Sequence, residues 1–155
     1  MGNVDISLSG SKEIKKYLAK TEKSLITHSL LEELGNFMDV RVQTRTLKGK
    51  NANEGQMGEY SPWAKKARDA LGLQTDHIDL FFTGSMFAAQ THKVAGNDVT
   101  SFFESTKDRK GNDNPEKAAR LDSRFNFFSL SANDADAILD KIKRHVSETI
   151  SHGRK

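Results

Sequence analysis

The residues of this chain that could do chemistry are its histidines and one short segment of acids around a histidine. The five histidines lack the spacing of metal ligands; they are His28, His77, His92, His145 and His152. The segment Asp76-His77-Ile78-Asp79 places carboxylates beside a base, as general acid–base catalysis would require. No nucleophile adjoins this segment and an apolar run follows it, so we interpret it as a surface turn.

Two further segments come close to ligand-binding motifs without matching them. Gly49-Lys50 is followed by Asn51 and has no upstream glycine, so it does not form a phosphate-binding loop. Residues 108–113 loosely follow a calcium loop, but Lys110 occupies the third position and the glycine comes too early. The chain has no cysteine, which excludes thiolate catalysis and Cys-ligated zinc. We therefore predict no catalytic residue, no metal, no cofactor and no enzyme.

A basic strip is the strongest local charge feature of a sequence whose net charge is only +3. Its members are Arg41, Arg45, Lys48 and Lys50, within ten residues that contain no acid. Such a strip could contact the phosphates of a nucleic acid. It could also be a solvated segment or lie against an acidic protein neighbour. We favour this second interpretation, in either form, over contact with a nucleic acid.

We predict a single α+β domain over residues 1–155, whose helices and strands position the residues described above. The length fits a single domain with its own core. No apolar run approaches the roughly 18 residues that a membrane-spanning helix needs. We expect a long N-terminal helix and a C-terminal helix, packed on a small antiparallel sheet with long loops.

The first half of the chain predicts a strand, a long helix, a loop and a short helix. Alternating apolar residues indicate a strand over residues 3–8. Ser11 opens the long helix, whose apolar face continues to Met38, although Gly35 is a candidate end. The residues that follow, up to Thr46, fit a helix or a strand. A glycine-containing loop over 49–58 then leads to a short helix, with Ser61 as cap, Pro62 at the first position and Gly72 at the end.

The second half predicts a turn, a hairpin and a polar loop. The Thr83-Gly84 turn should hold a backbone conformation that needs glycine. Strands over 90–94 and 98–103 are joined by a Gly-Asn connection, which is a hairpin signal. Residues 105–120 are the most polar stretch and predict an exposed loop, ordered only on assembly.

The last helix and the aromatic residues before it complete the predicted core. Ser131 opens this helix, with Asp134 in an approximate capping box, and the tail over 151–155 should fray. The phenylalanines of the second half fall in apolar runs without interleaved Lys or Arg, which favours core packing over base stacking. One or two of them should face a partner. They are Phe81, Phe82, Phe87, Phe102, Phe103, Phe125, Phe127 and Phe128.

Two segments about 40 residues apart carry a family resemblance. The first is the apolar run 78–87 with its Thr83-Gly84 turn, and the second is 123–131, where Arg124-Phe125 and an aromatic cluster precede the last helix. In this order they resemble small phage virion morphogenesis proteins of the tail-completion and head–tail-joining kind. The long first helix, the Tyr60-Ser61-Pro62-Trp63 segment and the hairpin follow the same order of parts.

The resemblance implies a non-enzymatic structural protein of a bacteriophage virion, made in the host bacterial cytoplasm. It would form a ring at the neck, six-fold or twelve-fold, that completes the tail or joins head to tail. Its partners would be copies of itself and portal, connector, tail-tube or terminator proteins, with no membrane. DNA would pass through the channel without specific binding, because repeated phosphate contacts would hold it back.

The candidate interface follows from this expectation. A ring subunit should pair its basic strip with carboxylates of a neighbouring subunit. The candidate interface residues are Arg41, Arg45, Lys48, Lys50, Arg109, Lys110, Arg124 and Phe125. The alternative function is that of a small basic nucleic-acid-binding protein.

Overall fold

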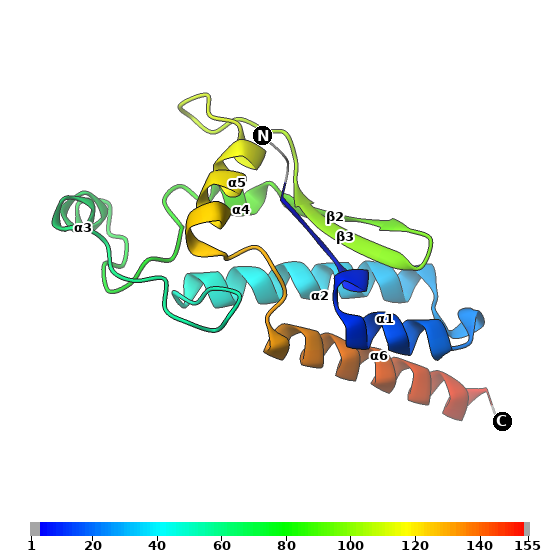
Figure 1. Cartoon of the computed structure of the whole chain (residues 1–155). Helices are drawn as coiled ribbons and strands as arrows, with labels where there is room; N and C mark the ends of the chain where they lie inside the picture. Colours follow the sequence, from blue (N-terminus) through cyan, green and yellow to red (C-terminus); the bar gives the residue numbers. More distant parts are fainter. Residues whose placement is uncertain (1–3, 154–155) are drawn as a thin grey trace.

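The computed structural model describes residues 4–153 and confirms the α+β class (Figure 1). The strands are β1 (Asp5–Ser7), β2 (Gln90–Ala95) and β3 (Asp98–Phe103). The helices are α1 (Lys12–Lys20), α2 (His28–Leu47), α3 (Pro62–Asp69), α4 (Ser85–Ala88), α5 (Asn114–Phe125) and α6 (Ala132–His152). Two short 3₁₀ helices, η1 (Leu8–Gly10) and η2 (Lys23–Leu25), flank α1.

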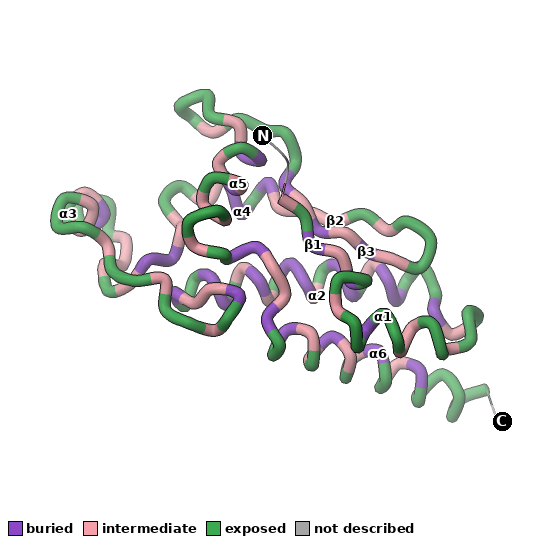
Figure 2. Tube along the Cα trace, in the orientation of Figure 1, coloured by how far each residue is buried: buried purple, intermediate pink, exposed green. Residues whose placement is uncertain are grey.

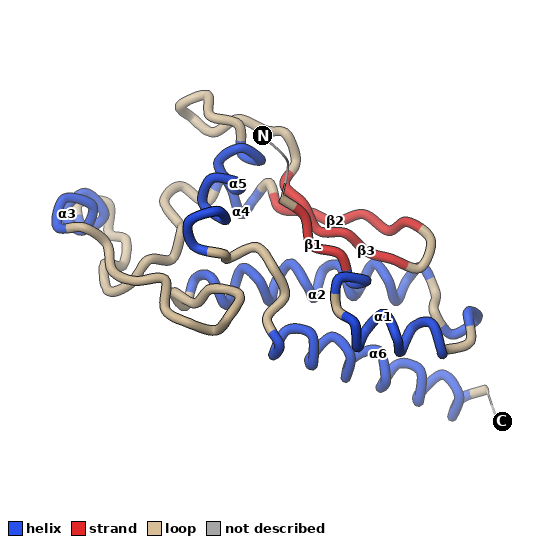
Figure 3. The backbone as a smooth tube through the Cα atoms, viewed as in Figure 1, coloured by secondary structure: helices blue, strands red, loops and turns tan. Residues whose placement is uncertain are grey.

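Helix α2 is the central element of the fold (Figure 3). The three strands form an antiparallel sheet in the order β1-β3-β2, and α2 packs against β2 and β3. The predicted hairpin is confirmed, since Gly96 and Asn97 join β2 to β3. Helix α6 packs on α2 and on α1, so the body consists of a small sheet over a layer of helices.

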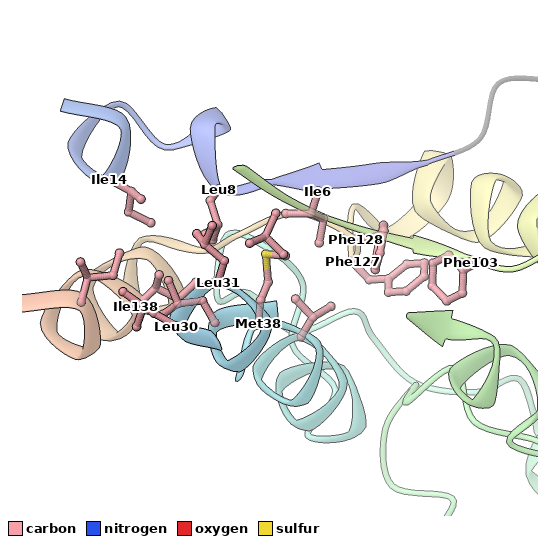
Figure 4. Packing of buried hydrophobic residues seen from close by; sticks show 14 of the residues in the cluster. Ile6, Leu8, Ile14, Leu30, Leu31, Met38, Phe103, Phe127, Phe128 and Ile138 are labelled. Carbon is pink, nitrogen blue, oxygen red and sulfur yellow. The ribbon is translucent and has the colours of Figure 1, made fainter. Parts of the chain in front are cut away.

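The core follows α2 along its length and continues into α6 and the sheet (Figures 2 and 4). Its fully buried side chains include Leu8, Ile14, Leu30, Leu31, Leu34, Met38, Val42, Val99, Phe127, Phe128, Ile138 and Ile142. The ring centroids of Phe103 and Phe128 are 4.5 Å apart. The prediction of aromatic core packing is confirmed for Phe87, Phe103, Phe127 and Phe128, whereas Phe82 is 47% exposed.

The prediction of one long N-terminal helix is wrong. Helix α1 ends at Lys20, and α2 begins after Thr27, whose Oγ1 accepts a hydrogen bond from the backbone N–H of Leu30 at 3.1 Å. The apolar spacing concealed this break, because Leu25 and Ile26 continue the stripe across it. Gly35 does not end α2, and the residues up to Leu47 are helical.

The prediction of one polar loop over residues 105–120 holds up to Asp113 and is wrong from Asn114 on. Helix α5 begins at Asn114, and the first two residues of this helix, Asn114 and Pro115, are buried, with Pro115 at a position that suits proline. The loop before it is ordered by Asp108, whose Oδ1 accepts from the backbone N–H groups of Lys110 at 2.8 Å and Asn112 at 2.9 Å. Charge density concealed the helix, since its buried side is formed by small residues such as Ala118.

The predicted start of the last helix is confirmed. The Ser131 hydroxyl accepts from the backbone N–H of Asp134, and the Asp134 carboxylate accepts in return from the backbone N–H of Ser131. The predicted frayed tail over residues 151–155 is wrong for its first two residues, because α6 continues through His152. The ends of two predicted segments, at Asn3 and at residues 154–155, lie outside the described residues.

Gly84 confirms the prediction of a turn that needs glycine, with φ +78° directly before α4. A Cβ at this position would also lie 3.0 Å from Cε2 of Phe81. We expect Gly84→Val to lower the free energy of unfolding by about 1 kcal/mol or more, measured by urea denaturation. Gly10→Val is the control, because a Cβ on Gly10 meets nothing within 4 Å. Equal stability of the two variants would contradict this prediction.

Candidate functional site

An arm, residues 49–82, projects from the body between α2 and α4 and carries α3 (Figure 1). Helix α3 starts as predicted, since the Ser61 hydroxyl accepts from the backbone N–H of Ala64 at 3.3 Å and Pro62 takes the first helical position. The base of the arm is tied to the end of α5, because the backbone N–H of Ala52 donates to the carbonyl of Asn126 at 2.8 Å.

A buried ion pair between Arg68 and Asp79 holds the arm together. Nη2 of Arg68 donates to both carboxylate oxygens of Asp79 at 3.1 Å. The same guanidinium donates to the carbonyl of Gln74 at 2.8 Å and to that of Phe81. It also lies 4.2 Å from the ring centroid of Tyr60. One side chain therefore joins α3 to the chain segment that returns to the body.

Tyr60 and Gln74 complete the shell around Asp79. The Tyr60 hydroxyl donates to Oδ1 of Asp79 at 2.7 Å, and Nε2 of Gln74 donates to Oδ2 at 2.6 Å. Burial, supported by the hydrogen bond to Asp79, raises the pKa of Tyr60 to about 12, so its hydroxyl stays a donor at neutral pH. The interpretation of residues 76–79 as a surface turn is therefore wrong for Asp79, whereas Asp76 is exposed.

An apolar groove of about 450 Å³ lies between the arm and α5. Its aliphatic lining is Ala64, Ala67, Ile78, Leu80 and Leu121. Trp63 also lines the groove and is 80% exposed. On the α5 side, the guanidinium carbon of Arg124 lies 5.0 Å from the ring centroid of Phe125. Exposed aromatic and apolar side chains around a hollow are typical of protein interaction surfaces.

A cationic cleft of about 400 Å³ adjoins this groove at Phe82, which lines both hollows. The basic residues of the cleft are Arg109, Lys110, Lys117 and Arg120. Only Lys117 of these four has an ion-pair partner within residues 4–153, Asp108, at 3.7 Å. The cleft therefore carries an uncompensated positive charge beside the apolar groove.

The basic strip of the sequence is not one surface in the structure. Arg45 is 5% exposed; its Nη1 donates to Asp134, and its Nη2 donates to the carbonyls of Phe127 at 2.5 Å and Ser129 at 2.9 Å. Nε of Arg41 donates to Oδ1 of Asp134 at 2.9 Å. Both arginines thus find their carboxylate within the chain. The interpretation of Arg45 as an interface residue is wrong because Arg45 is buried, whereas Arg41 is still 32% exposed and its interface role stays a prediction.

The structure groups some of the remaining candidate residues and separates others. Arg109 and Lys110 line the cationic cleft, and Arg124 and Phe125 line the groove next to it. Thr83 also lines the cleft, directly before Gly84. Lys48 and Lys50 line a different hollow, beside Arg41. An interface role for these residues stays a prediction.

A partly buried polar network joins the sheet to α2 through His92. Nδ1 of His92 lies 2.8 Å from Oδ2 of Asp39, and Nε2 lies 3.1 Å from Oε2 of Glu32. The Ser101 hydroxyl donates to Asp39. Ser, His and Asp are the residue types of a hydrolytic triad. Ser101 is fully buried and bonds to the acid instead of the histidine, so this network braces the fold and offers no accessible nucleophile.

Gly35 allows His92 to approach α2. A Cβ on Gly35 would lie 2.6 Å from Nε2 of His92, well inside van der Waals contact. We expect Gly35→Ala to lower the free energy of unfolding by about 1–3 kcal/mol, even though alanine is the better helix former. Urea denaturation measures the effect, with Gly10→Ala as the control in open space. Stabilisation by Gly35→Ala would show that His92 moves aside freely.

Stability should fall as the pH rises through the pKa of His92. Burial lowers the pKa of His92, but the hydrogen bonds and charges of Asp39 and Glu32 outweigh burial and raise it above the ordinary 6.5. The folded state then holds the proton more tightly than the unfolded chain. This stabilisation is full below pH 6.5 and is lost as the pH rises through the folded-state pKa.

Urea denaturation at a series of pH values above and below 6.5 measures this dependence. In His92→Gln the free energy of unfolding should change less over the same interval. An equal pH dependence in the two proteins would contradict the assignment to His92.

Within residues 4–153, no group of three or more His, Cys, Asp or Glu is arranged to hold a metal ion. No helix of the described chain combines the length and the hydropathy of a membrane span. No protein-family model, curated protein or solved structure matches this chain.

Sequence reasoning missed the parts of this site that depend on distant contacts. Arg68 and Asp79 have no regular spacing that would predict their pairing across an irregular segment. Trp63 did give a signal, since it is the one tryptophan of the chain and lies in a short helix rich in Lys and Arg. A large aromatic residue in so polar a helix is a sign of exposure.

Proposed function

We propose that this protein is a structural subunit of a bacteriophage virion that assembles as a ring at the neck, where it completes the tail or joins head to tail. The observation that carries the proposal is the arm. It projects from the body, is braced by the buried Arg68–Asp79 pair, and exposes Trp63 (80%) and Leu71 (60%). A braced projection with exposed apolar side chains fits an element that contacts a neighbouring subunit.

The ionisable groups inside the fold support a structural role. The Arg45–Asp134 pair joins α2 to α6, and the His92 network joins the sheet to α2. The Arg68–Asp79 pair braces the arm. Each of these groups is engaged in holding two segments together. The order of parts in the sequence, which resembles phage tail-completion and head–tail-joining proteins, supplies the virion context.

Electron microscopy of particles made without this protein tests the proposal. A stop codon early in its coding sequence should give separate heads and tails, because the ring between them is missing. Supplying the protein in trans should restore joined particles. Complete particles in its absence would overturn the proposal.

A matched pair of variants tests the arm as the assembly element. Trp63→Ser with Leu71→Ser should fail to restore joined particles. Ile150→Ser removes an apolar side chain that is also exposed (42%) but lies on α6, outside the groove, the cleft and the hollow of the basic strip, and it should restore them. Binding of duplex DNA that weakens steeply with salt would instead favour the alternative of a nucleic-acid-binding protein.

A further inference from the structure

We propose that the groove between the arm and α5 docks an acidic segment of a partner protein, which places large apolar side chains in the groove and carboxylates against the neighbouring cations. This inference rests on the proposed role of the arm in assembly and names the chemistry of the partner.

The groove offers an apolar surface to which large side chains of a partner can bind. The arm contributes Ile78 and Leu80, α5 contributes Leu121, and Trp63 lines the hollow at 80% exposure. A volume of about 450 Å³ is enough for several large side chains. An exposed tryptophan beside an aliphatic pocket is the arrangement in which interface residues contribute most binding energy.

One face of α5 carries the positive charge beside the groove. Lys117, Arg120, Leu121 and Arg124 follow helical spacing, so they share the face that borders both hollows. Within the described chain, Arg120 and Arg124 have no acidic partner. Arg109 and Lys110 lie unpaired on the other wall of the cleft.

The acids of the two hollows do not neutralise these cations. Glu59 pairs with Lys65 at 2.9 Å, which lowers the pKa of Glu59. Asp108 accepts hydrogen bonds from its own loop and lies 3.7 Å from Lys117. The surface that remains is apolar in one hollow and cationic in the next. Charge complementarity therefore calls for an occupant that is both apolar and anionic.

A protein partner other than a second copy fits this surface best. Outside the arm, the exposed large apolar residues of the described chain are Val40, Leu47 and Ile150. Val40 and Leu47 of α2 lie beside the basic Lys48, which does not complement a cationic cleft, and Ile150 of α6 is a single side chain, too little to fill the groove. Single-stranded nucleic acid would use aromatic faces to stack its bases. The groove is lined by aromatic residues (Tyr60, Trp63, Phe82 and Phe125) and also by five aliphatic ones, and the aliphatic side chains offer contacts that apolar side chains would use and stacked bases would not.

Trp63 provides a direct readout, because it is the one tryptophan of the chain. The probes are synthetic helical peptides with Leu or Phe at positions i, i+3/i+4 and i+7 and Glu elsewhere. A second panel replaces Leu and Phe by Ser, and a single-stranded oligo(dT) represents nucleic acid. Docking should shift the emission of Trp63 to shorter wavelength and protect it from acrylamide quenching.

We expect the Leu/Glu or Phe/Glu peptides to bind and the Ser peptides to bind at least about 10-fold more weakly. Arg120→Glu with Arg124→Glu should weaken binding by about 10-fold or more. The matched control, Lys15→Glu with Lys16→Glu on exposed positions of α1, changes the net charge equally and should bind within about 2-fold of the unchanged protein. Arg120→Gln with Arg124→Gln tests the same cations without charge reversal.

Three results would overturn the inference: no emission change with any apolar acidic peptide, equal binding of the Ser peptides, or binding of oligo(dT) in preference to peptide. Loss of joined particles without the protein, together with a negative peptide result, would refute this docking site and leave the virion role standing. Peptide docking by a protein whose absence leaves particles complete would refute the virion role and keep the docking site.

Discussion

Arg45→Ala should lower the free energy of unfolding by about 3–5 kcal/mol, the largest loss we expect from one substitution in the body of the protein. Its guanidinium connects α2 to Asp134 at the start of α6 and to the carbonyls of Phe127 and Ser129. Asp134 is also part of the capping box with Ser131. Removing Arg45 therefore leaves a buried carboxylate, a buried carbonyl and a partly buried carbonyl without their shared donor.

Urea denaturation of Arg45→Ala measures this loss, and Lys48→Ala is the control. Lys48 belongs to the same basic strip but is exposed, so its replacement should change the free energy of unfolding by less than about 0.5 kcal/mol. Arg45→Lys should also destabilise, because an ammonium cannot reproduce the planar fork that reaches three oxygens. A loss below about 1 kcal/mol in Arg45→Ala would show that Arg41 can hold Asp134 alone.

Arg45 also shows why the sequence did not separate surface charge from buried charge. Positions 41–50 present a run of cations without acids, and nothing local distinguishes Arg45 from Lys48. The partner, Asp134, is far along the chain in a helix start that was predicted for a different reason. Local signals such as the capping box, the Gly84 turn and the hairpin were predicted correctly, because each depends on neighbouring residues.

The errors in the fold have the same origin. The break between α1 and α2 lies in a stripe of apolar residues that continues across it, so periodicity alone could not show it. Helix α5 was hidden because its buried side is formed by Asn114, Pro115 and Ala118, none of which gives an apolar signal. The groove could not be predicted either, because it forms between two elements that are distant in the sequence. Helix α5 forms one wall and the arm forms the other.

Arg68→Ala should unfold the arm while the sheet, α2 and α6 stay folded. Between residues 53 and 82 the one buried apolar side chain is Ile78, and Met57, Leu80 and Phe81 are only partly buried against the core. The Arg68–Asp79 pair is therefore the main buried contact within this segment. Breaking a buried pair by removing one partner costs about 3–5 kcal/mol. We expect this cost to exceed the local free energy of unfolding of the arm, which is a small unit. The body keeps its own core of α2, α6 and the sheet.

Hydrogen exchange separates local from global unfolding. In Arg68→Ala the amide of Ile78, which donates to the carbonyl of Gly58 at 2.9 Å, should exchange at least about 100-fold faster, whereas amides of α2 should change little. The pKa of Tyr60, about 12 in the folded arm, should return toward its ordinary 10. Lys66→Ala, exposed on the same helix, is the control and should leave both readouts unchanged. An equal increase in the exchange rate of α2 amides would contradict this prediction, because it would show that the arm and the body unfold as one unit. If the α2 amides stay protected while the Ile78 amide exchanges faster, the arm wall of the groove depends on a single buried ion pair.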